Sequence, residues 1–412
     1  MEPKRPFSPG ASTPIVEASK PEHRIDHAYS ADCARRQDGV CLGFCLSRSK
    51  WLVGVGTPQR WTVRRHEALG GDLEGLLELL RRISAGEERR TGLPVKVHIC
   101  FEAGRDGHWL HRALTSAGYD VYEIDPASVA VDRRARRAKS DGVDVDKLVR
   151  TLGRLLRGEL DACRVVAVPS EAEEDAKRPH RERQRLVKEQ TAHRNRVKAL
   201  LFAQGIRDFD PMASDRRERL AALPIMPRLK AELARECRRL AAIIDDIAEV
   251  EAEMKAAIVP RRKAEPANAA SSPPSHMQTK IAQLYKLKSV GVHFSAVLAG
   301  EVYYRTFHNR RGVAQYIGLA PSPFQSGDMA RDQGIAKAGN GRARTAMIEL
   351  SWLWLRHQPD SALSKWFRER VGDQKGRVRR IAIVAMARKL AVALWRYLET
   401  GLIPEGAVLK RA

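Results

Sequence analysis

Three acidic residues in the first half of the chain have the types and the spacing of a metal site. Asp141 and Asp144, in KSDGVDVDKL, are three residues apart and would project from one face of a helix that begins at Asp141. Glu102 ends the apolar run VKVHICF, where a charge is costly unless it is paired or binds a ligand. Carboxylate oxygens suit Mg²⁺, and two such ions could activate a nucleophile and stabilise a leaving oxygen on phosphate. On the alternative interpretation, Asp141 caps the helix and Asp144 interacts with its dipole.

Ser326 is the candidate nucleophile in the second half of the chain. It lies in a loop before Gly327, within a Gly-, Ser- and Arg-rich stretch that runs into a helix beginning near Gly341. The cations that follow it are Arg331, Lys337, Arg342 and Arg344. A hydroxyl group among cations can attack a phosphodiester, because the cations stabilise the extra charge of the transition state. The alternative is a loop serine with a purely structural role.

The elements that must position the three acids form an α/β pattern over residues 39–175. Three strand-like runs, VCLGFCL, WLVGVG and RWTVRR, precede a helix with regularly spaced leucines that starts near Asp72. A buried strand ending at Glu102, a helix closed by Gly118, the strand YDVYEI and a helix from Asp141 follow. The order β-β-β-α-β-α-β-α predicts a mixed sheet flanked by helices. This is the order of a ribonuclease-H-like fold, although an ordinary α/β domain shares much of it.

The remainder of the chain divides by composition. Residues 1–38 are rich in Pro, Ser and charge and predict a disordered extension, and residues 260–277 predict a linker. Residues 278–400 contain strongly apolar helical segments and predict a mostly α-helical domain that carries the serine. Residues 401–412 form a short tail.

Residues 176–259 predict a basic helix followed by a coiled-coil arm. Lys and Arg recur along 178–201, which indicates a surface that follows phosphates or, on the alternative reading, a solvated helix face. Apolar residues recur at heptad spacing along 229–258, with Glu236 interrupting one of the two seams. The arm would either fold back within the chain as a helical hairpin or pair between subunits.

The charge of the chain favours a polyanionic partner, with nucleic acid as the first candidate. The 412 residues include 73 Lys plus Arg against 50 Asp plus Glu, a formal net charge of +23. A basic protein that is merely soluble or bound to the ribosome is the alternative. The candidate nucleic-acid-binding residues are Arg133, Arg134, Arg136, Arg137, Lys139, Arg181, Arg185, Arg194, Arg331, Lys337, Arg342 and Arg344.

The sequence argues against a membrane or disulfide-rich protein. It has no run of about 18 or more apolar residues, and its N-terminal segment lacks the apolar core of a signal peptide. The six cysteines form no CxxC pair, so neither a zinc ribbon nor a disulfide framework is indicated, and a reducing cytoplasm fits best. His108 and His111 have no second ligand cluster nearby and are interpreted as helix-surface or partner residues.

Several segments together resemble one known family. FEAGRDGHWLHRALTSAGYDVYEIDP, RRARRAKSDGVDVDKL, HRNRVKALLFAQGI, YIGLAPSPFQSG and KAGNGRAR resemble the transposases of the bacterial insertion sequence 110 family, the DEDD transposases or bridge-RNA-guided recombinases. The resemblance implies an N-terminal ribonuclease-H-like domain, a coiled coil and a C-terminal transposase domain. It also implies Mg²⁺-dependent DNA strand exchange at a composite site, guided by a structured RNA. Glu102, Asp141 and Asp144 would bind metal, and Ser326 would attack DNA.

Two positions depart from the pattern of this family. The family's first-strand aspartate falls on Cys45, whose thiol has an ordinary pKa near ~8.5 and prefers softer metals than Mg²⁺. Cys45 is therefore a degenerate metal position that we expect to face Glu102 across neighbouring strands, unless a one-residue register slip places it in the core. The family also has a Pro-Gly-apolar-Gly turn where this chain has SVGV, so Ser289 must take a turn position that glycine adopts more easily.

The leading hypothesis is a site-specific DNA recombinase of a mobile element. Several subunits, as a dimer or a tetramer, would bring the acids of one chain to Ser326 of another. A second hypothesis is a catalytically impaired remnant that still binds nucleic acid, because of Cys45. A third is a junction-resolving nuclease, which would need only the acids.

Overall fold

The structure is a computed structural model, and it describes residues 39–57, 60–104, 106–129, 140–159, 161–258, 276–326 and 329–410. The chain divides after Val168 into two compact units. The predicted N-terminal extension, nearly all of the predicted linker and the basic run 133–139 lie outside the described residues. No helix in the described ranges is long and apolar enough to cross a membrane.

The first unit contains a five-stranded mixed sheet, as predicted. The strands are β1 (Gly39–Leu46), β2 (Lys50–Thr57), β3 (Arg60–Leu69), β4 (Lys96–Glu102) and β5 (Asp120–Ile124). Their order in the sheet is β3-β2-β1-β4-β5. The first three strands form an antiparallel meander, whereas β4 runs parallel to both β1 and β5.

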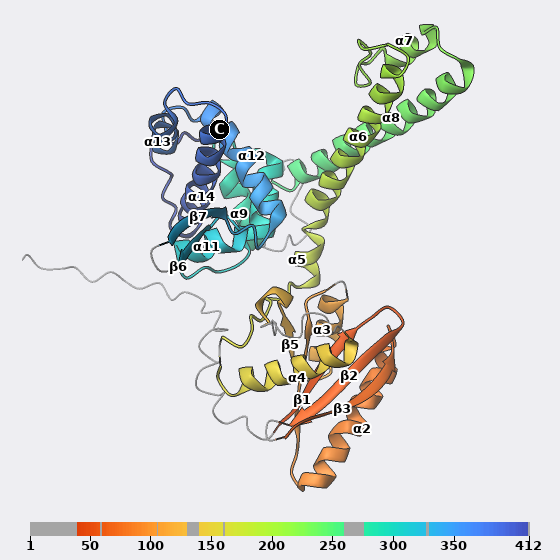
Figure 1. Cartoon of the computed structure of the whole chain (residues 1–412), viewed down its shortest axis with the longest axis vertical. Helices are drawn as coiled ribbons and strands as arrows, with labels where there is room; N and C mark the ends of the chain where they lie inside the picture. Colours follow the sequence, from red (N-terminus) through yellow and green to blue (C-terminus); the bar gives the residue numbers. More distant parts are fainter. Residues whose placement is uncertain are drawn as a thin grey trace, which may run out of the picture. The chain divides into compact units, whose positions relative to one another are not determined.

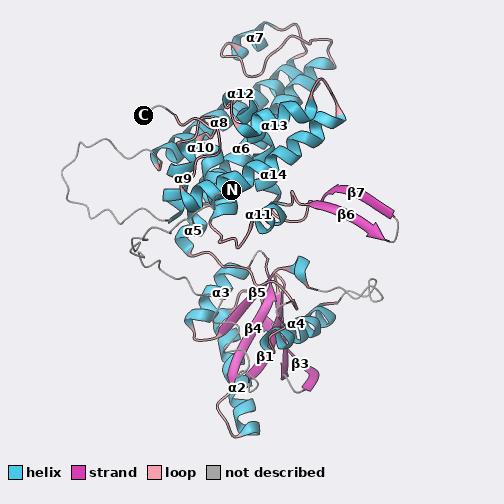
Figure 2. Ribbon diagram, turned by 90° about the vertical axis from the view of Figure 1, so that its left-hand side faces the viewer, coloured by secondary structure: helices cyan, strands magenta, loops and turns pink. Residues whose placement is uncertain are grey.

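Helices cover both faces of this sheet (Figure 2). They are α2 (Leu73–Thr91), α3 (Gly107–Ser116), the 3-10 turn η2 (Pro126–Ser128) and α4 (Asp141–Leu156). Leu42 and Phe44 of β1 pack on one face with Leu110 of α3. Cys41 packs on the opposite face with Leu148 of α4. Alternate residues of β1 therefore face different helical layers, as the pleat of a strand requires.

Two glycines allow α4 to lie close to the sheet. A Cβ atom at Gly54 of β2 would lie 2.1 Å from Cγ1 of Val145, and one at Gly43 of β1 would lie 3.0 Å from Cβ of Leu148. The contact at Gly54 is shorter than real Cβ atoms make and the one at Gly43 is tighter than most, so a side chain at either position would press on α4. The small residues thus set the distance between β1 and the helix that carries Asp141.

The second unit begins with a helical arm (Figure 1). Its helices are α5 (Glu171–Asp175), α6 (Arg178–Phe202), α7 (Arg216–Ala222) and α8 (Pro227–Ala256). Leu186 of α6 packs with Ile243 and Val250 of α8, and an ion pair between Arg183 and Glu251 joins the same two helices. The arm is therefore a helical hairpin within the chain. Pairing of arms between subunits stays a prediction.

Glu236, the charge that interrupts the heptad pattern, is buried and paired. Its carboxylate lies 2.6 Å from Nδ1 of His193 on α6 and accepts a hydrogen bond of 2.7 Å from Arg239. Burial would raise the pKa of Glu236, but the hydrogen bond to His193 and the charges of Arg239 and Arg196 lower it. A polar contact thus joins α6 and α8 where the apolar seam is broken.

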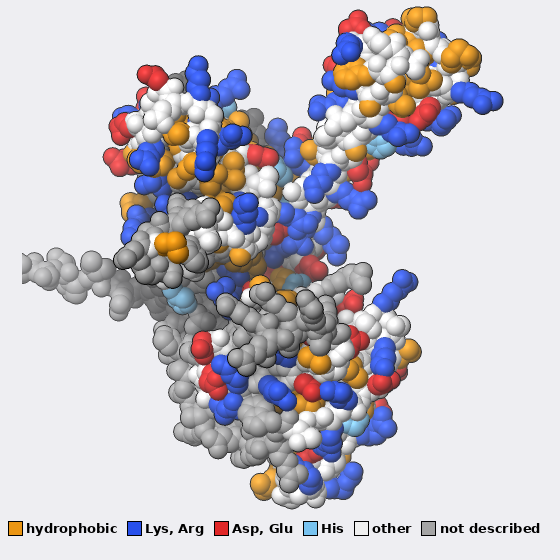
Figure 3. Space-filling view, in the orientation of Figure 1, with side chains coloured by type: hydrophobic (Ala, Val, Ile, Leu, Met, Phe, Trp, Pro, Cys, Tyr) orange, Lys and Arg blue, Asp and Glu red, His pale blue; other side chains and the backbone are white. Residues whose placement is uncertain are grey.

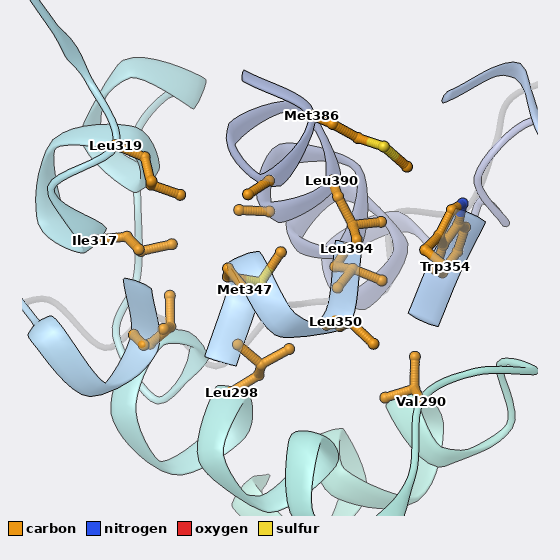
Figure 4. Packing of buried hydrophobic residues seen from close by; sticks show 14 of the residues in the cluster. Val290, Leu298, Ile317, Leu319, Met347, Leu350, Trp354, Met386, Leu390 and Leu394 are labelled. Atoms are coloured by element: carbon orange, nitrogen blue, oxygen red, sulfur yellow. The ribbon is translucent and has the colours of Figure 1, made fainter. Parts of the chain in front are cut away.

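The rest of the second unit is mostly helical, as predicted. Its helices are α9 (His276–Tyr285), α10 (Val292–Leu298), the π-helical turn η3 (Ala299–Tyr303), α11 (Arg310–Ile317), α12 (Gly341–His357), α13 (Ala362–Val371) and α14 (Arg377–Thr400). Figure 4 shows Met347 and Leu350 of α12 packed toward Leu390 and Leu394 of α14. Trp354 is fully buried in this core, so its ring packs there and is not exposed to stack on bases.

A two-stranded hairpin projects from these helices (Figure 2). It consists of β6 (Pro321–Ser326) and β7 (Met329–Ile335), which pair in antiparallel fashion. The segment 401–410, predicted as a tail, packs back on the same unit. Leu409 forms a β-bridge with Leu287, and Val408 exchanges hydrogen bonds of 2.8 Å in both directions with the buried side chain of Gln358.

Ser289 has the backbone conformation that the sequence predicts for it. Its φ is +86°, a region that residues with a Cβ atom rarely adopt. It precedes Gly291, which is the N-cap of α10. The hydroxyl group of Ser289 is buried and has no hydrogen-bond partner among the described residues.

Candidate catalytic site

Cys45 and Glu102 lie side by side at the C-terminal ends of the neighbouring central strands β1 and β4. In the parallel register of β1 and β4, Phe44 is opposite Phe101, so Cys45 and Glu102 are the residues that follow in each strand. Phe44 and Phe101 belong to the core on the α2 and α3 face. By alternation, the side chains of Cys45 and Glu102 point to the α4 face.

The first turn of α4 brings two more acids to this place. Asp141 and Asp144 lie in that turn, and the N-cap of the helix is Ser140, whose hydroxyl accepts a hydrogen bond from the Val143 backbone N–H. The structural alternative for Asp141 is therefore wrong, because Ser140 caps the helix. Asp146 points elsewhere and forms an ion pair of 2.8 Å with Arg65 of β3.

Cys45 lies among the three predicted acids. The pKa of its thiol is raised to about 11, first by burial and then by the charges of Asp141 and Asp144, a hydrogen bond to Asp141 and the charge of Glu102. Each of these carboxylates is thus close enough to act on the sulfur. The thiol is protonated near neutral pH, so it donates a hydrogen bond instead of binding a cation.

The chemistry of these side chains suits Mg²⁺ only in part. Carboxylate oxygens are its usual protein ligands, whereas a neutral thiol is not. Within the described ranges, no group of three or more His, Cys, Asp or Glu side chains is arranged to hold a metal ion. Mg²⁺ in proteins commonly uses one or two carboxylates and takes its other ligands from water and substrate phosphates. The acids around Cys45 fit that partial role.

Ser326 is the last residue of β6, at the tip of the hairpin. Its backbone pairs with Met329 of β7, and the turn residues between them lie outside the described part of the chain. The expectation that Ser326 lies in a loop is therefore wrong by one residue, because the strand continues to it. The following helix, α12, begins at Gly341, as predicted.

The base of the hairpin is held by close backbone contacts. Gly339, with φ of +106°, lies so near α11 that a Cβ atom there would be 2.2 Å from the Tyr316 carbonyl oxygen. Arg344 donates a hydrogen bond of 2.8 Å to the carbonyl oxygen of Lys337 in the same loop. The backbone N–H of Ala336 binds the carbonyl of Ala320, closing the two strands below Ser326 at 2.9 Å.

Glu301 is a buried carboxylate that the sequence did not single out. It lies in the π-helical turn η3 and contacts the basic helix α6 and the start of α12. Its Oε1 accepts hydrogen bonds from His180 at 3.1 Å and Arg181 at 2.8 Å, and its Oε2 accepts one from Asn340 at 2.9 Å. Burial would raise the pKa of Glu301, but these three hydrogen bonds hold it well below its usual range.

Asn340 connects this carboxylate to the helix that follows the hairpin. It is the N-cap of α12, and its side-chain oxygen accepts hydrogen bonds from the backbone N–H groups of Arg342 and Ala343. Its amide nitrogen binds Glu301 at the same time. Glu301 therefore fixes the position of α12, and with it the base of the hairpin that carries Ser326.

Comparison with known proteins places these features in one family. The segment 282–365, which contains η3, the hairpin and the whole of α12, matches the model of the transposase IS116/IS110/IS902 family. The protein y4rJ of Sinorhizobium fredii, named as a transposase, is 43% identical over 89% of this chain and 93% of its own length. The chain belongs to the IS110 family of transposases.

More distant relatives agree with this assignment. The transposase for insertion sequence element IS1111A of Coxiella burnetii is 26% identical over 80% of the present transposase and 85% of its own length. A Pseudomonas aeruginosa protein named as a family 20 transposase is 26% identical over 73% of the chain and 83% of its own length.

The basic residues of this transposase take different places in the structure. Arg133, Arg134, Arg136, Arg137 and Lys139 lie outside the described residues, as does the side chain of Arg331. Arg181 and Arg344 bind internal acceptors, and Arg342 donates a hydrogen bond of 2.8 Å to Gln184. These three guanidinium groups have structural partners in addition to any role toward nucleic acid.

The remaining predicted cations are more open to solvent. Arg185 is highly exposed and pairs with Glu189 of the same helix, while Arg194 and Lys337 are exposed. Lys and Arg side chains are distributed along the arm formed by α6 and α8 (Figure 3). The arm of the transposase thus retains cationic groups that can contact phosphates.

His108 of the transposase has a partner that its sequence position did not reveal. Its Nδ1 lies 3.0 Å from Oε2 of Glu123, a fully buried acid on β5. His111, one turn further along α3, has its pKa lowered, chiefly by burial. The pair of histidines therefore belongs to the packing of α3 on β5.

Proposed function

We propose that this transposase cuts and exchanges DNA strands with Ser326 as the nucleophile and with Glu102, Asp141 and Asp144 as assisting acids. The observation that carries the proposal is the gathering of the three acids around Cys45, at the edge where β1 and β4 end. Acidic side chains repel one another, so their convergence on one point favours a function that uses a cation there.

The topology of the first unit supports a ribonuclease-H-like assignment. A three-stranded antiparallel meander is followed by two strands parallel to its first strand, with α4 on the face where the acids lie. The ends of the central strands are thereby open to a ligand, and this is where α/β sheets commonly bind substrates.

Mg²⁺ is the cation that we propose for the acids. When bound, it would neutralise charge on the phosphate and lower the barrier to displacement of a phosphate oxygen. Glu102, Asp141 and Asp144 would hold it, with Cys45 contributing a hydrogen bond to Asp141 and no ligand. The binding affinity is therefore expected to be lower than that of a site with a fourth acid.

Ser326 would supply the attacking oxygen. Its oxygen forms a bond to phosphorus while the bond from phosphorus to one sugar oxygen breaks. The serine proton passes to water, and the released sugar oxygen takes up a proton from water to become a hydroxyl group. Cationic side chains around the hairpin would stabilise the added negative charge. The Glu301 contacts would keep the hairpin base and the start of α12 fixed during this step.

A guide RNA and a homo-oligomer complete the proposal. The formal net charge of +23 exceeds what a small DNA contact needs and leaves cationic surface for a structured RNA. A structured RNA that is transcribed from a non-coding segment beside the gene and is recovered with the purified protein would support RNA guidance.

Covalent trapping tests the proposed chemistry. The full-length protein is incubated with Mg²⁺ and DNA that carries the flanks of its gene, then denatured and separated by mass. We expect a protein–DNA adduct with the wild type, none with Ser326→Ala, and wild-type levels with Ser322→Ala, a serine of the same strand. An adduct that persists in Ser326→Ala would exclude this nucleophile.

A second function is favoured by Cys45 itself. A neutral thiol at the centre of the acids suits a remnant that binds nucleic acid without cutting it. In the same trapping experiment, this alternative predicts DNA binding by the wild type with no adduct. An adduct that forms only after Cys45→Asp would support it.

A further inference from the structure

A cavity lies at the end of the sheet where β1 and β4 terminate, on the face covered by α2 and α3. It has a volume of about 280 Å³ and is lined by Ser47, Arg48, Trp51, Gly71, Asp106 and Trp109. Ser47 and Arg48 follow the end of β1, shortly after Cys45. Asp106 lies in the link from β4 to α3, shortly after Glu102. The segments that follow Cys45 in β1 and Glu102 in β4 therefore form part of the wall of this cavity.

Trp109 presents an indole ring to the cavity. One side of the ring packs against the buried Trp51, with ring centroids 6.0 Å apart, and 37% of the residue remains exposed. Tryptophan offers a large flat surface that is costly to leave in water. An exposed indole backed by a second, rigid indole is suited to stack on another flat ring.

Ser47 of the cavity hydrogen-bonds the backbone of Lys50, but the two charged side chains, Asp106 and Arg48, are not used in this way. Asp106 is the N-cap of α3, yet its carboxylate makes no capping hydrogen bond, unlike the N-cap side chains Asp72 and Ser140. Arg48 is exposed and has no acidic partner within the described ranges. A carboxylate and a guanidinium group are thus both available beside the exposed ring.

We propose that this cavity receives an unpaired base of the DNA strand that is cut. The base would stack on Trp109, and Arg48 would contact the adjoining phosphate. The inference deepens the proposed function and rests on it, because the acids on the α4 face would hold a phosphate of the same strand. A strand that crosses the edge of β1 and β4 would then have a phosphate on one face of the sheet and a base on the other.

The dimensions and chemistry of the cavity favour a single base. Its volume is near the lower limit of the roughly 300–1,000 Å³ typical of small-molecule sites. Stacking accepts any base, since all have a π face. The carboxylate of Asp106 accepts hydrogen bonds and would favour the exocyclic amino groups of adenine, cytosine and guanine over thymine, which has none.

Fluorescence of 2-aminopurine tests the stacking directly. The full-length protein is titrated with single-stranded DNA that contains one 2-aminopurine. The salt concentration is set high enough to weaken binding that depends only on phosphate contacts. We expect quenching with the wild type, with affinity reduced about tenfold and quenching lost in Trp109→Leu, which keeps apolar volume without a ring. Arg48→Gln should weaken binding and retain quenching. Phe202→Ala, which removes an exposed ring from α6, should bind like the wild type.

Three results would overturn the proposal. The first is unquenched 2-aminopurine on the wild type, and the second is unchanged binding and quenching in Trp109→Leu. The third is quenching of 2-aminopurine in an RNA oligonucleotide and not in DNA of the same sequence, which would assign the cavity to the guide RNA. Circular dichroism of Trp109→Leu, matched to the wild type, verifies that the variant is folded.

The trapping experiment separates failure of this inference from failure of the proposed function. If Trp109→Leu binds and quenches like the wild type while the Ser326 adduct still forms, only the base-binding cavity is excluded. If the wild type quenches 2-aminopurine but forms no adduct, the cavity stands as a nucleic-acid site and the nucleophile assignment fails.

Discussion

The thiol of Cys45 on β1 is hydrogen-bonded to the carboxylate of Asp141, the first residue of α4. The contact joins the end of a central strand to the start of the helix that covers it. A protonated thiol can donate to this carboxylate, whereas an aspartate at the same place would repel it. The contact between Cys45 and Asp141 therefore needs no cation, whereas two carboxylates at these positions would need a cation to offset their repulsion.

Cys45→Asp should make the first unit depend on Mg²⁺. A fourth carboxylate among Glu102, Asp141 and Asp144 adds like-charge repulsion in the absence of metal and an oxygen ligand in its presence. We expect a lower thermal unfolding midpoint than the wild type in EDTA and an increase on adding Mg²⁺. Excess ligand at 100 times its Kd contributes about 2.7 kcal/mol to stability. Formation of the DNA adduct should also increase.

Cys45→Asn is the matched control for that variant. It has the shape of aspartate without the charge, so its unfolding midpoint should respond little to Mg²⁺. An equal response of both variants, or none in Cys45→Asp, would contradict the assignment of Cys45 to a metal position.

Glu301→Gln should destabilise the second unit by about 3–5 kcal/mol at pH 7, because it removes one partner from a buried charged network. The depressed pKa of Glu301 means that its carboxylate stabilises the fold above its unfolded pKa, and this contribution is lost as the pH falls. The difference in unfolding midpoint between wild type and variant should therefore narrow below about pH 4.5.

Glu189→Gln is the control for Glu301. Glu189 pairs with Arg185 on the exposed side of α6, where an ion pair contributes little. A difference between Glu301→Gln and the wild type that stays constant from pH 7 to pH 3 would show that Glu301 is not held as a carboxylate.

Ser289→Gly should stabilise the protein by about 1 kcal/mol. The substitution relieves a positive φ that costs about 1–3 kcal/mol for a residue with a Cβ atom, less the greater freedom of glycine in the unfolded chain. It also removes a buried hydroxyl that has no partner in the described ranges. Chemical denaturation measures the change. Ser289→Ala removes the hydroxyl and keeps the strain, so a gain as large in Ala as in Gly would disprove the backbone explanation.

Removal of residues 406–412 should lower the unfolding midpoint. The truncation breaks both hydrogen bonds of Gln358 to Val408, the bridge from Leu409 to Leu287, and a hydrogen bond of 2.9 Å from Lys410 to the Val290 carbonyl. A buried polar group left without partners costs about 1–3 kcal/mol. Removal of only 411–412 should have no effect. Identical midpoints for both truncations would mean that the C-terminal segment does not stabilise the unit.

Periodicity made the elements of the first unit predictable. The strand that ends at Glu102 and the helix that starts at Asp141 were expected from residues within a few positions of each. The alternative that Asp141 caps this helix was wrong, because Ser140 and Asp141 are both good capping residues and only the backbone decides between them. Ser326 was expected in a loop because its neighbours are turn-forming residues, whereas pairing with Met329 places it in β6.

The sequence alone determined which acids share a helical turn and that the chain carries an excess of cations. These properties depend on spacing and composition, which act over a few residues. The tertiary structure decided that Glu301 binds His180 and Arg181, about 120 positions earlier, and that Trp109 rests on Trp51 beside an uncapped Asp106. The partner of a buried charge or ring depends on how distant segments of the chain pack together, so it cannot be predicted from the residues next to it in the sequence.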